Sequence, residues 1–82
     1  MNFHLRFNGM IKINDIVKIK NCDSQPQYRV YLYQIGLVIK GPYEDNIRIS
    51  NDCTMVCLVC DLMVSGTIVP GIPIQDLSRV RP

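Results

Sequence analysis

The clearest pattern in the chain is a short alternation of apolar and polar residues, which is typical of β-strands. It is strongest between Asp15 and Lys20, where Val17 and Ile19 alternate with Lys18 and Lys20. Apolar runs between turn-forming residues predict further strands at 35–40, 47–50, 55–64, 67–69 and 78–80, of which 55–64 is expected to be the longest. The run 28–34 also alternates, and residues 28–50 hold either an additional strand or a long insertion.

The segments between these strands carry turn-forming residues. Loops are predicted at 21–27 and 41–46, and turns at 51–52 and 65–66. Pro70 and Pro73 confine their segment to a sheet edge or a bend, because proline lacks a backbone donor. Gln75–Leu77 predicts a single 3₁₀ turn before the last strand.

Composition supports an all-β fold. The chain has no alanine, and valine and isoleucine together supply 19 of its 82 residues. Their branched side chains fit a pleated sheet better than a helix. A chain of this length has room for one domain, and a closed barrel is the economical architecture because closure removes exposed edges. We predict a barrel over residues 10–82, preceded by an N-terminal extension at 1–9.

Three sequence stretches carry a family resemblance. Asp15-Ile-Val-Lys-Ile, Ile35-Gly-Leu-Val-Ile-Lys and Gly71-Ile-Pro-Ile-Gln-Asp-Leu-Ser-Arg-Val follow one another in an order that resembles small SH3-like barrels. The likeness is to Tudor-like and KOW-like modules and to short barrel proteins of phages and bacteria, and it covers roughly residues 13–80. It implies five to six strands. It fixes no function, because this fold serves nucleic-acid, peptide and assembly roles alike, and an accessory phage role follows from the resemblance only.

Charge and hydropathy narrow the functional classes. Nine basic and seven acidic residues give a net charge of +2, without the basic stripe of a dedicated nucleic-acid binder. No apolar run approaches the length of a membrane helix, so no membrane partner is expected. The first ten residues lack the apolar core of a signal peptide, which makes a cytoplasmic location the expectation.

The four cysteines and the single histidine indicate no catalytic or metal centre. Cys57 and Cys60 form one Cys-x-x-Cys pair, but residues three apart in a strand point to opposite faces and cannot share a metal ion. Cys22 and Cys53 lack the spacing of a second pair, so we interpret all four as small hydrophobic side chains. His4 has no evident nucleophilic partner. We predict a protein that is not an enzyme and binds no cofactor.

The run 55–64 is apolar on both of its faces. One face is assigned to the interior and consists of Val56, Leu58, Cys60, Leu62 and Val64. The opposite face, with Met55, Cys57, Val59, Asp61 and Met63, is too apolar for a barrel wall in water. It is covered either by the chain's own residues 1–9 or 21–34, or by another subunit. We favour the subunit and predict an interface of a homo-oligomer at Met55, Cys57, Val59 and Met63.

A second predicted surface contains Arg29, Tyr31 and Tyr33, which share one face of the alternating run, with Tyr43 and Arg48 placed nearby. Tyrosine and arginine together stack on bases and bind phosphates, and tyrosine also lines peptide grooves. Tyrosines that simply cover the core are the third explanation. The sequence therefore predicts a self-associating interaction module. The alternative is a nucleic-acid-binding barrel that uses Arg29, Tyr31, Tyr33 and the scattered lysines, and a peptide partner is still open.

Overall fold

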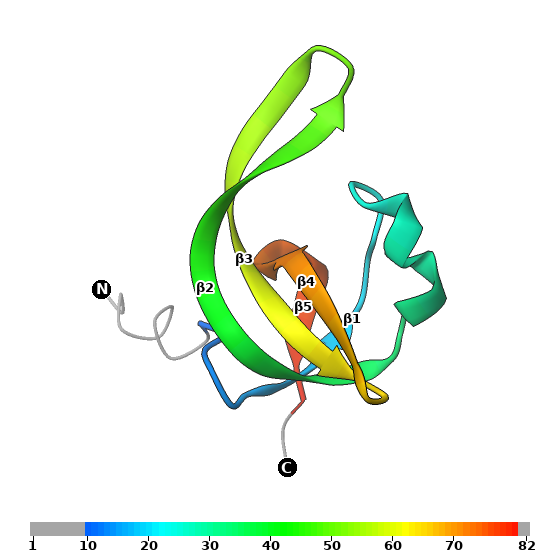
Figure 1. Cartoon of the computed structure of the whole chain (residues 1–82), viewed down its shortest axis with the longest axis vertical. Coiled ribbons are helices and arrows are strands. Elements are labelled where there is room, and N and C mark those ends of the chain that lie inside the picture. Colours follow the sequence, from blue (N-terminus) through cyan, green and yellow to red (C-terminus); the bar gives the residue numbers. More distant parts are fainter. Residues whose placement is uncertain (1–9, 81–82) are drawn as a thin grey trace, which may run out of the picture.

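The computed structural model describes residues 10–80, and its regular structure is almost entirely β (Figure 1). The predicted extension at 1–9 lies outside the described residues. The strands are β1 (Ile16–Ile19), β2 (Ile35–Ser50), β3 (Cys53–Val64), β4 (Thr67–Pro73) and β5 (Leu77–Arg79), and the 3₁₀ helices are η1 (Pro26–Tyr31) and η2 (Ile74–Asp76). The predicted all-β class and the 3₁₀ turn before the last strand are confirmed.

The five strands form one antiparallel sheet in the order β4-β3-β2-β1-β5. The sheet curls around its core, but within residues 10–80 no ladder joins β4 to β5, so it does not close as expected. β4 is an edge strand, which accommodates Pro70 and Pro73 as predicted. Val17 and Ile19 of β1 are buried, whereas Lys18 and the following Lys20 are exposed. The alternation therefore predicted the buried face of β1 correctly.

Strand β2 is continuous for 16 residues, which corrects the loop predicted at 41–46 and the two short strands predicted beside it. It is also longer than the 12-residue β3, which was expected to be the longest strand. Its pairing with β3 runs from Leu37 opposite Met63 to Ser50 opposite Cys53. The turn-forming residues of this stretch are held extended by a partner strand that lies further along the chain, and local composition does not reveal that partner.

The outer halves of β2 and β3 form a hairpin arm, defined here as residues 43–50 with 53–58. The arm projects away from the other strands (Figure 1). The turn at its tip lies at Asn51–Asp52, as predicted. The second hairpin turn is also where it was expected: Ser65 and Gly66 both have positive φ and connect β3 to β4.

The alternating run 28–34 is not a strand, because most of it lies in η1. Pro26 begins the helix, where its missing backbone donor costs nothing. The Tyr28 N–H donates to the Gln25 carbonyl (2.9 Å), and the Leu32 N–H donates to the Arg29 carbonyl (3.0 Å). With three residues per turn, Tyr28 and Tyr31 lie on the same side of the helix, and both pack against the main core.

The buried apolar residues form two clusters. The main core is enclosed by the curled sheet and consists of Ile11, Val17, Ile19, Val38, Cys60, Leu62, Val64, Val69, Ile72 and Leu77. A smaller second cluster contains Ile47, Cys57 and Val59, with Tyr43 packed against it. Strand β3 contributes to both clusters. The part of the chain that the structure describes contains no helix long and apolar enough to cross a membrane.

Candidate interaction surfaces

The predicted subunit interface on β3 is largely filled by the chain itself. Val59 has no exposed surface and Cys57 is 9% exposed, whereas Met55 is 47% exposed and Met63 is half-buried. Val59 and Cys57 belong to the second cluster, together with residues of β2. The middle of this face is therefore buried against residues of the neighbouring strand β2. The alternative that residues 1–9 cover it lies outside the described residues.

Val59 and Cys57 are buried because the buried face of β3 changes along the strand. Cys57 and Val59 are buried on one side of the strand, and Cys60, Leu62 and Val64 on the other. Opposite this point β2 carries two irregularities, between Val38 and Lys40 and between Lys40 and Tyr43. Such bulges bend a strand and increase its twist. Both faces of β3 are thus apolar because each packs into a hydrophobic cluster of the same chain.

Because the buried face of β3 changes along the strand, two residues that were predicted to point inward are not buried. Val56 is 63% exposed, which contradicts its assignment to the interior, and Leu58 is only half-buried. Both lie in the hairpin arm, where the covered side of β3 carries Cys57 and Val59. Met55 and Val56 are therefore exposed on the arm, and Met63 lies in another part of the sheet.

A different apolar surface crosses the outer face of the sheet. Ile16 pairs with Leu37, and Leu37 in turn pairs with Met63. Met63 pairs with Ile68 on β4, and on the other side the Val80 N–H donates to the Ile16 carbonyl (2.8 Å). Cross-strand partners point to the same face of a sheet. The result is an outer row with a residue from each of β4, β3, β2 and β1 and the residue after β5.

The outer row is exposed over most of its length. Ile68 is 56% exposed, Ile16 49%, Val80 41% and Leu37 40%, and Met63 is half-buried. Ile35, two residues before Leu37, is also exposed and extends the patch. Of these residues, the sequence indicated only Met63. Each of β1 to β4 contributes one apolar residue to the row itself. The sequence of any single strand therefore does not indicate this surface, and only the strand register shows it.

The structure does not gather the five residues of the predicted ligand surface. Tyr31 packs against the main core, and Tyr43 and Arg48 lie on the hairpin arm. Arg29 and Tyr33 do lie together, at a pocket of about 270 Å³ between η1 and the segment after β1. Lys20, Asn21, Cys22, Asp23 and Leu32 also line this pocket. From the sequence, Cys22 was interpreted only as a small hydrophobic side chain, and Lys20 was one of the scattered lysines of the nucleic-acid alternative.

Tyr43 has a structural partner that the sequence did not indicate. Its hydroxyl donates to Asp61 Oδ1 (2.6 Å), and the Gly71 N–H donates to the same oxygen (2.9 Å). The hydrogen bond to Asp61, with burial as the second cause, raises the pKa of Tyr43 to about 12. Lys40 Nζ lies 5.0 Å from the centre of the Tyr43 ring. Asp61 therefore connects β2 to the bend of β4 at Gly71.

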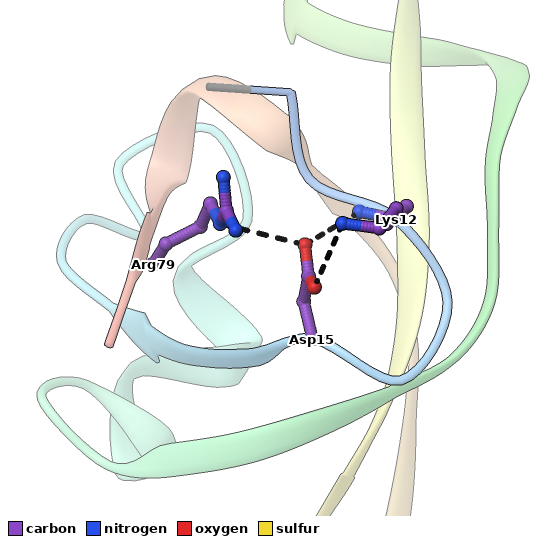
Figure 2. A network of polar contacts seen from close by, with 3 residues as sticks. All are labelled: Lys12, Asp15 and Arg79. Carbon is purple, nitrogen blue, oxygen red and sulfur yellow. Dashed lines mark hydrogen bonds and ion pairs between the residues drawn. The ribbon is translucent and has the colours of Figure 1, made fainter. Parts of the chain in front are cut away.

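Asp15 and Asp76 hold local structure through their carboxylates. Asp15 Oδ2 accepts the Lys12 backbone N–H (2.9 Å), and its carboxylate lies 3.5 Å from Lys12 Nζ and 3.6 Å from Arg79 Nε (Figure 2). This network connects the turn before β1 to β5. Asp76 is 8% exposed and hydrogen-bonds to Ser24, while burial, followed by the charge of Asp23, raises the pKa of its carboxyl.

The cysteines occupy separate environments. Cys57 lies in the second cluster and Cys60 in the main core, on opposite faces of β3, as their spacing predicted. Burial, followed by the charges of Asp61 and Asp15, raises the pKa of Cys60 to about 11. Cys22 is buried and Cys53 exposed, and all four are free thiols. Over residues 10–80 no group of three or more metal-binding side chains comes together.

Comparison with family models, with curated proteins and with solved structures found no match for this chain. The class of the protein is therefore defined by its structure, as a small all-β fold with a five-stranded antiparallel sheet compatible with a barrel-like architecture.

Proposed function

We propose that this chain is a non-catalytic interaction module, an SH3-like barrel that pairs with a second copy of itself through the outer row. The observation that carries the proposal is the continuous exposed aliphatic row across the full width of the sheet. Contiguous apolar patches of this kind are uncommon on soluble monomers and usually mark contact sites.

A second copy is the occupant that fits the chemistry of the row. The row consists only of aliphatic and methionine side chains, so it offers neither a charge nor a strong hydrogen-bonding group to a polar partner. Two such rows related by a two-fold axis present the same uncharged surface to each other, which is the arrangement of an isologous dimer. Covering the exposed half of each Ile, Leu or Val side chain contributes about 1 kcal/mol.

The proposal keeps one part of the interface predicted from the sequence and relocates the rest. Met63 is one residue of the outer row and lies between Leu37 and Ile68. Its flexible side chain can adapt to a facing copy. Met55 belongs to the hairpin arm, and Cys57 and Val59 face the second cluster. The self-association surface therefore runs across five strands and does not follow β3.

Sedimentation equilibrium of the full chain over the micromolar range tests the proposal. We expect the wild-type protein to approach twice its single-chain mass as concentration rises. Ile16→Lys and Ile68→Lys place a charge at two separate points of the row and should each give a monomer, because a buried unpaired ammonium is costly.

Val56→Lys is the matched control. It places the same charge on an even more exposed aliphatic residue of a strand, outside the row, and should leave the dimer intact. A wild-type protein that stays monomeric throughout would overturn the proposal. So would a dimer that both row variants retain, or a dimer that only the Val56 variant disrupts.

A further inference from the structure

The pocket beside η1 combines apolar and charged groups. It is lined by Leu32, which packs against the main core, and by three exposed residues defined here as its rim, which are Lys20, Arg29 and Tyr33. At about 270 Å³ the pocket is near the small end of the range for ligand sites.

Tyr33 is the least expected residue of this rim. Its φ of 69° lies in the left-handed region, which costs a residue with a β-carbon energy that glycine avoids. The backbone is fixed there by β1: the Tyr33 N–H donates to the Ile19 carbonyl (2.6 Å), and the Ile19 N–H donates to the Gln34 carbonyl (3.1 Å). The ring is nevertheless 67% exposed, so burial of the side chain does not compensate for this cost.

The two cations of the rim are available to a ligand. Among residues 10–80, neither Lys20 nor Arg29 has a carboxylate within ion-pair distance. They come from different elements, Lys20 from the residue after β1 and Arg29 from η1, and they converge on the same pocket. Asn21 and Asp23 also line the pocket. Asn21 Oδ1 accepts the Asp23 backbone N–H (2.8 Å), so Asn21 offers its amide NH₂ and Asp23 its carboxylate to the edge of a base.

We propose that this pocket binds one nucleotide of a single-stranded nucleic acid. In this complex the base stacks on the Tyr33 ring, and Lys20 and Arg29 hold the adjacent phosphates. Asn21 and Asp23 face the edge of the base. The site is independent of the outer row, because the two share no residue. It differs from the surface predicted from the sequence, since Tyr31, Tyr43 and Arg48 do not line the pocket.

Fluorescence anisotropy with labelled single-stranded DNA and RNA dodecamers tests the proposal at low ionic strength. We expect saturable binding that weakens with salt. Two phosphate contacts predict a slope of log K against log salt of about −1.4, falling to about −0.7 in Arg29→Gln or Lys20→Gln. An unlabelled mononucleotide should compete only weakly, because it lacks the second phosphate contact.

Tyr33→Gly separates binding from folding. Glycine adopts the observed φ without strain, so the variant should fold at least as well as the wild type, which urea unfolding checks. Loss of the ring should weaken binding about tenfold or more, whereas Tyr33→Phe should retain it. Arg48→Gln, which removes a charge from another exposed arginine, on the hairpin arm, is the matched control and should bind as the wild type does.

Three results would overturn the proposal. The first is the absence of binding to either dodecamer at low salt. The second is undiminished binding by Tyr33→Gly. The third is an equal loss of affinity in Arg48→Gln and Arg29→Gln, which would indicate attraction by net charge alone. Binding of a peptide at this pocket with no binding of nucleic acid would also contradict it.

Discussion

Val59 and Cys60 are adjacent in β3, and both are completely buried although their side chains point to opposite faces of the strand. Val59 packs into the second cluster beside the hairpin arm, and Cys60 packs into the main core. This pair marks the point at which β3 exchanges one buried face for the other. Because of this exchange, both faces of β3 are buried at its middle. The exposed apolar surface lies instead in the outer row.

Truncation of Val59 should destabilise the monomer and not only an assembly. Val59→Ala removes fully buried methyl groups, and we expect the free energy of unfolding to fall by about 2 kcal/mol. Val56→Ala removes the same atoms from a 63% exposed side chain and should change it by less than about 0.5 kcal/mol. Urea unfolding measures both. Equal effects of the two substitutions would show that Val59 is not enclosed by its own chain.

Gly41 should be the least replaceable glycine of the sheet. Its φ is +108°, and an added β-carbon would lie 2.7 Å from the Val59 carbonyl oxygen and 3.1 Å from Cys60 Cα. Both contacts are with backbone of the partner strand, so neither can move aside cheaply. We expect Gly41→Ala to cost about 3 kcal/mol or more.

Gly66 is the control for backbone conformation alone. Its φ is +80°, but a β-carbon there would meet nothing within 4 Å. Gly66→Ala should therefore cost only about 1 kcal/mol, the ordinary penalty of the left-handed region. Denaturant unfolding measures both variants. Equal stability of the two alanine variants would contradict the close contact between β2 and β3 at Gly41.

The hydrogen bond between Tyr43 and Asp61 predicts a loss of stability at alkaline pH. The folded pKa of Tyr43, about 12, lies above the ordinary value of 10.0. A raised folded pKa means that the neutral hydroxyl is favoured in the folded state. The stabilisation is therefore complete below pH 10 and disappears as the pH rises towards 12.

Tyr43→Phe tests this assignment. It should lower the free energy of unfolding at neutral pH by about 1 kcal/mol and reduce the loss seen between pH 10 and 12. Part of the alkaline loss should remain, because burial also raises the pKa of Tyr28. Tyr33→Phe removes a hydroxyl from an exposed ring and serves as the control. An unchanged pH profile in Tyr43→Phe would contradict the role of Asp61.

The four thiols should differ sharply in reactivity. Cys53 is exposed on the hairpin arm, whereas Cys22, Cys57 and Cys60 are buried, and burial raises the pKa of Cys60 to about 11. Since the thiolate is the reactive form, Ellman's reagent at mildly alkaline pH should titrate one thiol rapidly in the folded protein and all four after unfolding. Cys53→Ser should abolish the rapid phase. Rapid reaction of two or more thiols in the folded state would be inconsistent with this burial.

The amino-acid sequence by itself determined the elements whose signals are local. The alternation of Val17 and Ile19 with lysines specifies β1 and its inner face, because side chains alternate within any one strand. Ser65-Gly66 specifies the β3–β4 turn through residues that tolerate positive φ. The spacing of Cys57 and Cys60 likewise places them on opposite faces of one strand.

Only the tertiary structure decided how these elements combine. The continuity of β2 through Gly41 depends on pairing with β3, and the change of buried face at Val59 depends on the bulges in that pairing. The outer row depends on the register of five strands, and the pocket at Tyr33 on the docking of η1 beside β1. Alternation states which side of one strand a residue faces. Strand register, bulges and the packing of η1 are set by contacts between distant segments. The local pattern of apolar and polar residues therefore does not predict them.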